Sequence, residues 1–356
     1  MEITFIVVIK ALGLTILLLY LIGLVIGLIK PLPKKDVDEV EKVSKDKPKK
    51  DLMSGAPITF DTFKGQPKAT ELLKTHVIAS NITGNVVPHI MLEGPGGTGK
   101  TTLALCVANE VDTNLYVTTP STFKDKDAVF NFFFDENNIC KLQEGDVLFI
   151  DEIHRVREAA AIYLYSAMQD FYMDSGEGQI LDIPEITFIG ATTDLGMLPS
   201  PFRDRFKIRV GLVTYSKEDL KEIIMASEDL DNEVAIEIAN RSCGIPRIAK
   251  SITENTIAYS VANGIKIADV KCVDNVCKLL DIDENGLSGS ARRVVKFFQE
   301  NDNNPMGAMS LANTLNISRE TMEHDIFPVL FTLDILQSNG TRGKSLSSKG
   351  VIYNAG

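Results

Sequence analysis

The sequence has no tryptophan, and it has only four histidines in 356 residues. Its five cysteines are an odd number, and no two of them form a C-x-x-C pair. We therefore expect reduced, packed thiols, as in a cytosolic domain, with neither a disulfide framework nor a zinc site. Basic residues are also the minority, because 37 Lys and Arg stand against 48 Asp and Glu, a net charge of −11. This balance argues against a uniformly basic nucleic-acid binder, although it is compatible with a local basic surface.

Charge is missing from one long stretch near the N-terminus. Residues 3–29 are almost wholly apolar, and from residue 11 onward the stretch carries no charge. A helix of that length spans the hydrocarbon core of a bilayer. Three lysines follow it and no small-residue cleavage site does, so we predict a transmembrane anchor over residues 1–30, with the rest of the chain in the cytoplasm. A signal peptide and a buried helix are the alternatives, and without insertion the protein would be plainly cytoplasmic. Residues 31–56 are rich in charge and proline and predict a disordered linker.

Residues 94–102 match the phosphate-loop pattern G-x-x-x-x-G-K-[ST] in full. An apolar strand candidate leads into them and an apolar helix candidate leaves them. In that setting the glycines let backbone N–H groups curl around a phosphate at a helix N-terminus. Lys100 is then expected to reach the β- and γ-phosphates of ATP, and the Thr101 hydroxyl to hold Mg²⁺. The predicted nucleotide-binding residues of this loop are Gly94, Gly96, Gly97, Thr98, Gly99, Lys100, Thr101 and Thr102.

A second strand candidate, residues 147–150, ends in two acids. Its sequence, Val-Leu-Phe-Ile, is typical of a buried parallel strand, and Asp151 and Glu152 follow directly. Open α/β sheets bind their ligands at the carboxyl ends of such strands. We expect Asp151 to orient Mg²⁺ and its waters, and Glu152 to activate the water that attacks the γ-phosphate.

Four further side chains are candidates for the same chemistry. Thr193 ends another apolar strand candidate, where it could bond the attacking water or the γ-phosphate, or could be an ordinary strand-end threonine. Arg203 and Arg205 flank an aspartate, so they form either a surface ion pair or a group that completes a neighbouring subunit's site. Arg247 follows a helix-starting proline, a place from which an arginine can reach over the phosphates; an ordinary helix-start arginine is the alternative.

The phosphate loop does not stand alone. Taken with Asp-Glu-Ile-His-Arg (151–155), Gly-Ala-Thr-Thr (190–193), Arg-Asp-Arg-Phe (203–206) and Gly-Ile-Pro-Arg (244–247), it resembles the AAA+ ATPases. Within them it is most similar to the RuvB-type Holliday-junction branch-migration motors of bacteria, and the resemblance runs from about residue 60 to the C-terminus.

The resemblance implies a role for each of the candidate side chains. Lys100 and Thr101 would belong to Walker A, Asp151 and Glu152 to Walker B. Thr193 would be sensor 1. Arg205, rather than Arg203, would be the arginine finger that acts on the neighbouring subunit, and Arg247 would be the sensor 2 arginine.

The C-terminal part fits the same resemblance. Its pattern predicts three helices and then a small hairpin, over residues 287–300, 310–315, 318–333, 335–339 and 344–348. This order looks like the winged-helix tail of the RuvB-type motors, with residues 339–344 as the wing. Arg342 and Lys344 would then face DNA phosphates, whereas an exposed turn with two ordinary basic residues is the alternative.

Three features depart from the family. The family has no membrane anchor. The segment 172–184 is shorter than the family's hairpin that docks the RuvA-type junction-binding partner, so that partner is expected only if the shorter segment still docks it. Lys64 stands at a usually apolar position of the adenine-pocket motif, before Gly65 and Gln66, and could alter contacts to the base.

We therefore predict an α/β P-loop AAA+ motor domain (57–213), a helical lid (214–283) and a winged-helix domain (284–356) behind the anchor and linker. The chain would form a homo-hexameric ring that binds ATP and Mg²⁺ between its subunits. Hydrolysis would move duplex or four-way-junction DNA in recombination and repair. The alternative is a membrane-tethered AAA+ switch or remodeller acting on a protein partner, which the anchor, the acidic charge and the short segment favour.

Overall fold

The computed structural model of the chain describes residues 41–43, 58–175 and 178–355. Every described residue belongs to one compact unit of the chain. The predicted membrane anchor (1–30) lies outside the described residues, as does most of the predicted linker. Within the described ranges no helix is both long enough and apolar enough to span a bilayer.

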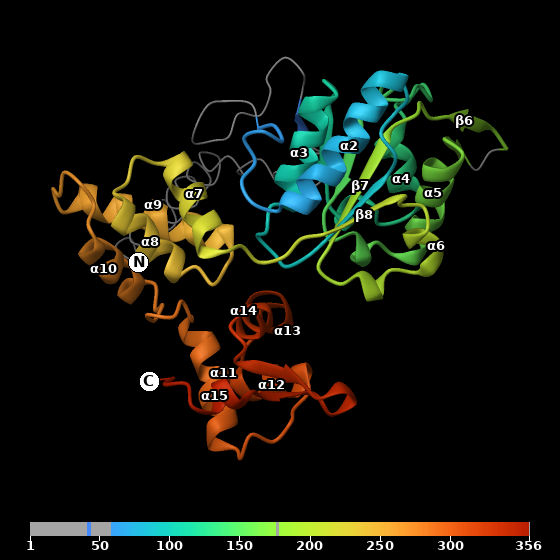
Figure 1. Cartoon of the computed structure of the whole chain (residues 1–356). Helices are drawn as coiled ribbons and strands as arrows, with labels where there is room; N and C mark the ends of the chain where they lie inside the picture. The colour runs from blue at the N-terminus through green and yellow to red at the C-terminus, as the bar shows by residue number, and fades with distance from the viewer. Residues whose placement is uncertain (1–40, 44–57, 176–177, 356) are drawn as a thin grey trace, which may run out of the picture. The chain divides into compact units, whose positions relative to one another are not determined.

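The first part of the fold is built on a six-stranded sheet in the order β1-β3-β4-β7-β2-β8 (Figure 1). Five strands run parallel to their neighbours, and β1 pairs antiparallel with β3 at one edge. Parallel neighbours need crossover connections, so strands distant in the sequence lie side by side. The carboxyl ends of β4, β7 and β2 therefore meet at one edge of the sheet. The strands are β1 (Glu41–Val43), β2 (Ile90–Glu93), β3 (Leu115–Thr118), β4 (Val147–Ile150), β7 (Thr187–Thr192) and β8 (Ile208–Gly211).

β1 lies inside the segment predicted to be a disordered linker, so that prediction is wrong for residues 41–43. The strand pairs with β3 in the register Glu41↔Val117 and Val43↔Leu115. A three-residue edge strand is held by backbone hydrogen bonds and needs no alternation of apolar side chains. The sequence therefore carried no signal for it.

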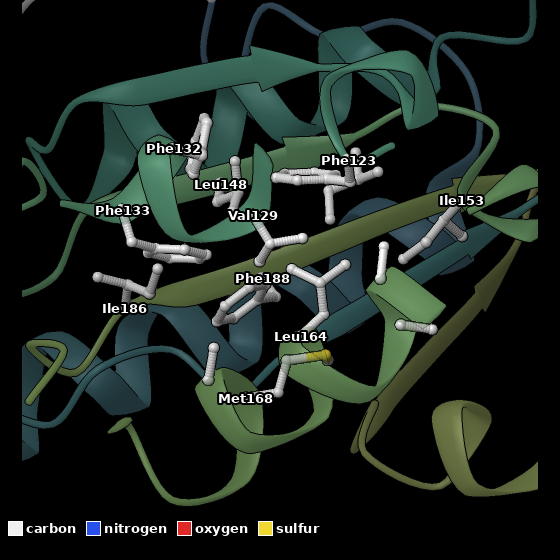
Figure 2. Packing of buried hydrophobic residues seen from close by; sticks show 14 of the residues in the cluster. Phe123, Val129, Phe132, Phe133, Leu148, Ile153, Leu164, Met168, Ile186 and Phe188 are labelled. Carbon is white, nitrogen blue, oxygen red and sulfur yellow. The ribbon is translucent and has the colours of Figure 1, made fainter. Parts of the chain in front are cut away.

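The sheet buries side chains on both faces. Leu148 and Ile150 of β4 pack into one cluster, whereas Val147 and Phe149 pack into the other. Figure 2 shows part of the first cluster, where Phe188 of β7 lies beside Val129 and Leu164. Burial on both faces explains why β4 is apolar throughout, as the sequence predicted. Each large side chain buried here contributes about 1.5–3 kcal/mol.

Four helices supply the covering layers. α4 (Lys126–Phe133) and α5 (Glu158–Gln169) pack on the phenylalanine-rich face, and α2 (Pro67–Thr83) and α3 (Lys100–Glu110) pack on the other. Asp125 starts α4 by accepting a hydrogen bond from the Ala128 N–H at 2.9 Å, as an N-cap residue does. A short 3₁₀ turn after Glu152 precedes α5.

The smaller elements of this part connect the layers. β5 (Tyr172–Asp174) and β6 (Ile180–Asp182) form a separate antiparallel hairpin in the segment that the sequence marked as short. The remaining turns and the one short helix are η1 (Pro120–Thr122), η2 (Ile153–Arg155), η3 (Leu195–Met197) and α6 (Ser200–Arg203).

A helical segment follows the sheet. Ser216 caps its first helix by accepting from the Asp219 N–H at 3.0 Å, as an N-cap serine does. Pro246 occupies the first turn of the third helix, as expected. The helices are α7 (Lys217–Ser227), α8 (Asn232–Asn240), α9 (Pro246–Ala262) and α10 (Val270–Leu279).

The C-terminal part has the predicted order of helices and hairpin, with one difference. The third helix, predicted as continuous over 318–333, is interrupted by the π-turn η4 (Met322–Ile326). Pro328 explains the interruption, because proline has no N–H to donate to the carbonyl four residues earlier. The elements are α11 (Gly289–Glu300), α12 (Ala308–Leu315), α13 (Arg319–Thr321), α14 (Phe327–Thr332), β9 (Leu336–Ser338), η5 (Gly340–Arg342), β10 (Lys344–Leu346) and α15 (Ser348–Val351).

Candidate active site

The phosphate loop lies between β2 and α3, as its sequence predicted. Gly99 precedes α3 and has no side chain to cap the helix, so the first N–H groups of α3 are left for an anion. Thr98 is fully buried, and its hydroxyl donates to the Pro95 carbonyl at 2.8 Å, inside the loop. Its side chain therefore shapes the loop, and only its backbone can serve a phosphate. Thr101 is exposed, with its hydroxyl accessible to a ligand.

Lys100 is 7% exposed and lies folded over the loop. Its Nζ donates to the carbonyl oxygens of Gly94 at 2.7 Å and Pro95 at 3.0 Å. Burial lowers the pKa of Lys100, while the carboxylates of Glu152 and Asp151 oppose that shift. A buried ammonium whose partners are neutral carbonyls is suited to exchange them for phosphate oxygens.

Asp151 and Glu152 follow β4 at the edge of the sheet where the phosphate loop leaves β2. Burial raises the pKa of Asp151, the adjacent Glu152 raises it further, and Lys100 opposes the shift. Glu152 adopts a left-handed backbone conformation with φ of 47°, which a residue other than glycine rarely does. Such conformations cluster at functional sites, and here the conformation turns the chain sharply after the buried strand.

Thr193 follows β7 and lies beside Glu152, which follows β4. The Thr193 hydroxyl donates to Glu152 Oε2 at 3.2 Å. β4 and β7 are adjacent parallel strands in the register Ile150↔Gly190, which brings the two side chains together.

Sequence reasoning missed the part played by His154. Its side chain is 2% exposed, and its Nδ1 lies 3.3 Å from Glu152 Oε2 and 2.9 Å from the Thr192 hydroxyl. Burial lowers the pKa of His154, and Glu152 opposes the shift. The only signal was the position of His154 within the Asp-Glu-Ile-His-Arg stretch, from which no role was assigned.

Arg247 lies against the phosphate loop, at the start of α9. A Cβ added at Gly97 would come within 2.7 Å of Arg247 Cβ and 3.1 Å of Ile245 Cγ2, and Gly97 has φ of +78°. Glycine is therefore needed at this position both for its backbone angle and for the close approach of α9. This contact brings the predicted lid arginine to the nucleotide loop.

Residues around the predicted adenine-pocket motif also approach the phosphate loop. A Cβ added at Gly99 would come within 3.3 Å of the Phe63 ring, and the Tyr215 hydroxyl donates to the Thr98 carbonyl at 3.0 Å. Gln66 adopts a left-handed conformation, and its side-chain amide pairs with both backbone groups of Val213. Lys64, the departure from the family motif, is exposed.

Arg205 lies elsewhere, after α6. Its guanidinium donates to the carbonyls of Tyr165 and Pro201 and to Gln169 Oε1, and it lies 4.7 Å from the centre of the Tyr165 ring. Arg203 is half-buried, and Asp204 pairs with Arg209 at 3.2 Å instead of with either neighbour. The surface-pair alternative for Arg203 and Arg205 is therefore not what the structure shows.

The predicted DNA contacts lie at the C-terminal hairpin. Arg342 is exposed, whereas Lys344 is half-buried with its Nζ 4.7 Å from the centre of the Phe327 ring. The lysine side chain packs on the domain's own aromatic core, so the two residues differ in how freely they can reach a ligand.

Comparison with known proteins agrees with this geometry. Residues 56–212 match the Holliday junction DNA helicase RuvB P-loop domain. The Holliday junction branch migration complex subunit RuvB of Lactobacillus johnsonii is 34% identical over 89% of this chain and 97% of its own length. The corresponding subunit of Fervidobacterium nodosum is 34% identical over 85% of this chain and 89% of its own length.

The chain belongs to the RuvB family. The structure of the Thermotoga maritima RuvB Holliday junction branch migration motor has 33% sequence identity, covers 82% of this chain and 95% of its own, and superposes with a TM-score of 0.74. The RuvB-type motor domain is a nucleotide-binding P-loop fold of the AAA+ class, and the enzyme class is ATP hydrolase.

Proposed function

We propose that this chain hydrolyses ATP to drive branch migration of Holliday junctions. The observation that carries the proposal is the meeting of Lys100, Asp151, Glu152, Thr193 and Arg247 around one loop. The two relatives named for branch migration match this chain along 97% and 89% of their own length.

Asp151 and Thr101 fit a magnesium ion. Asp151 is a carboxylate whose raised pKa reflects burial beside a second carboxylate, and a divalent cation would offset both effects. Thr101 offers an exposed hydroxyl at the start of α3. When bound, Mg²⁺ would neutralise charge on the phosphates and order the bound nucleotide.

The remaining residues divide the work of hydrolysis. Lys100 binds phosphate oxygens, and the N-terminus of α3 adds its N–H groups. Glu152 accepts the proton of the attacking water, and Thr193 orients that water or the γ-phosphate. Arg247 reaches over the phosphates from the lid helix α9.

Arg205 acts in trans within a ring of identical chains. Its guanidinium is held in place by backbone carbonyls and an aromatic ring, which keeps an arginine pointed in one direction. A neighbouring copy would supply the same group to this chain's nucleotide. Six copies are expected from the family resemblance.

Arg342 and Lys344 of a winged-helix domain contact DNA phosphates. The β5–β6 hairpin remains the place where a RuvA-type partner would dock. Residues 1–30 would tie the motor to a membrane, with the catalytic part in the cytoplasm. Support for these three points comes from the sequence pattern and the family likeness.

The test is ATP hydrolysis by the full chain alone, with duplex DNA and with four-way-junction DNA, followed by a strand-exchange gel assay on the junction. Stimulation by junction DNA together with junction migration is expected. Hydrolysis indifferent to DNA would contradict the proposal and favour a remodeller of a protein partner. Absence of hydrolysis would contradict the catalytic assignment itself.

A further inference from the structure

His324 of the C-terminal part reaches the catalytic edge of the motor domain. Its Nδ1 lies 3.3 Å from the Thr193 hydroxyl, and its Nε2 lies 3.0 Å from Arg155 Nη2. Arg155 in turn pairs with Glu320, one turn before His324, at 2.6 Å. Two elements separated by more than a hundred residues of chain thus meet beside Glu152.

The donors and acceptors of this contact can have only one order. An arginine guanidinium has no acceptor, so Nε2 of His324 must accept from Arg155. The proton of the neutral ring then sits on Nδ1, which donates to the Thr193 oxygen. The Thr193 proton is left for Glu152 Oε2, to which the hydroxyl is 3.2 Å away. The chain of donation runs Arg155, His324, Thr193, Glu152.

This order occupies two groups that hydrolysis needs. Thr193 cannot direct its proton to water or phosphate while it donates to Glu152. Glu152 Oε2 already accepts a hydrogen bond from Thr193 and lies 3.3 Å from His154 Nδ1, so this carboxylate oxygen is occupied by protein groups instead of by the attacking water. The site is therefore held in a resting arrangement by a contact from outside the motor domain.

We propose that His324 is a positioning residue that holds Thr193 on Glu152 and restrains ATP hydrolysis until the C-terminal part binds DNA. The release by DNA rests on the function proposed above, whereas the restraint itself does not. The contact is suited to release, because the side chains of Arg155 and Glu320 are 42% and 66% exposed, and exposed ion pairs contribute little.

The experiment measures kcat and KM for ATP in full-length variants without DNA and then with junction DNA. His324→Ala removes both contacts, and we expect the DNA-free kcat to rise about fivefold, equivalent to ~1 kcal/mol, with KM unchanged. His324→Asn keeps an N–H near the position of Nδ1. Its DNA-free kcat should therefore lie between those of the unaltered protein and His324→Ala. The rate with DNA should be the same in all three proteins, so the stimulation by DNA shrinks.

The matched control is a pair of glutamates three residues apart. Glu320→Gln breaks the ion pair with Arg155 of the motor, and its DNA-free kcat should rise about twofold. Glu323→Gln breaks a pair of similar length, 2.9 Å to Arg319 on the same helix, and its kcat should stay unchanged.

A DNA-free kcat that falls or stays constant in His324→Ala, with an unchanged melting temperature, would overturn the proposal. If DNA fails to stimulate the unaltered protein, the proposed function fails, while the DNA-free rate of His324→Ala still decides whether the restraint exists. A rise in both His324→Ala and Glu323→Gln would also count against the assignment, because it would point to general loosening.

Discussion

The phosphate loop and the C-terminal hairpin are both glycine-containing turns that carry basic residues, but the burial and the partners of those basic side chains differ. Lys100 is 7% exposed and donates to two backbone carbonyls, with carboxylates and Arg247 around it. Arg342 is exposed, and Lys344 packs on Phe327. The first loop sits at the end of a buried sheet, and the second connects two three-residue strands.

The difference decides what each charge can do. Around a buried ammonium the effective dielectric constant is low, so a phosphate placed there interacts strongly and in one geometry. Around an exposed guanidinium salt screens the attraction, and many phosphate positions are equivalent. The surroundings of the first loop suit chemistry on one ligand, and those of the second are compatible with the DNA contact proposed above.

The largest effect should come from the carboxylate at the first site. Glu152→Gln keeps the shape of the side chain but removes the base, so kcat for ATP should fall by about 10²–10⁴-fold while ATP still binds. Glu185→Gln, at an exposed acid before β7, should leave kcat unchanged. Steady-state hydrolysis measures kcat, and a nucleotide-binding titration measures the affinity for ATP. An active Glu152→Gln protein would remove this residue from the catalytic assignment.

Two glycines compare the loops directly. Gly97 and Gly340 have φ of +78° and +61°, but a Cβ at Gly97 would strike Arg247, whereas among the described residues nothing lies within 4 Å of one at Gly340. Gly97→Ala should weaken ATP binding at least about tenfold, because displacing Arg247 would cost the charged hydrogen bond proposed between this arginine and the phosphates. Gly340→Ala should lower the free energy of unfolding by about 1 kcal/mol and leave ATP binding intact. Equal effects on ATP binding would mean that the contact with Arg247 is unimportant.

The proposed role of the C-terminal hairpin should be visible in the salt dependence of DNA binding. Replacing Arg342 and Lys344 together by Ala should weaken DNA binding and reduce the slope of log K against log salt by about 2. ATP binding should not change. A matched double variant, Lys271→Ala with Lys278→Ala on α10, removes the same charge from an exposed helix face. If both double variants lose DNA affinity alike, net charge rather than the hairpin is responsible.

The smallest effect should come from His89, a buried histidine that precedes β2 at the end opposite the phosphate loop. His89 Nε2 donates to the Met168 carbonyl at 2.8 Å, Nδ1 accepts from the Phe188 N–H at 3.2 Å, and burial lowers the pKa of His89. The folded protein therefore keeps this ring neutral while the unfolded chain binds a proton below about pH 6.5. The contribution of neutral His89 to the free energy of unfolding is fully present above that pH. It is lost as the pH falls toward the lowered pKa of the folded protein.

Denaturant-unfolding curves recorded between pH 5 and 8 measure this decline in the free energy of unfolding. His89→Gln should show a shallower pH dependence, with kcat at pH 7.5 little changed. An identical pH dependence in the two proteins would assign the decline to other groups.

The sequence anticipated the strands, the phosphate loop and the acids at the end of β4, because each is written in a short local pattern. It could not anticipate β1, which depends on backbone pairing with β3, or the π-turn, which depends on where Pro328 leaves a carbonyl unpaired. The roles of His154 and His324 were also invisible. A single histidine has no pattern, and its meaning depends on what lies beside it in space.

By itself the sequence indicated which residues are chemically suited to bind and hydrolyse a nucleotide. Glycine spacing, a lysine at a helix start and acids after an apolar run are demanded by the chemistry wherever they occur. Only the tertiary structure decided which residues meet: Thr193 on Glu152, Arg247 on Gly97, and His324 on Thr193. The physical reason is that hydrogen bonds and close contacts act over a few ångströms, whereas the segments that make them are distant along the chain until the parallel sheet and its neighbours pack.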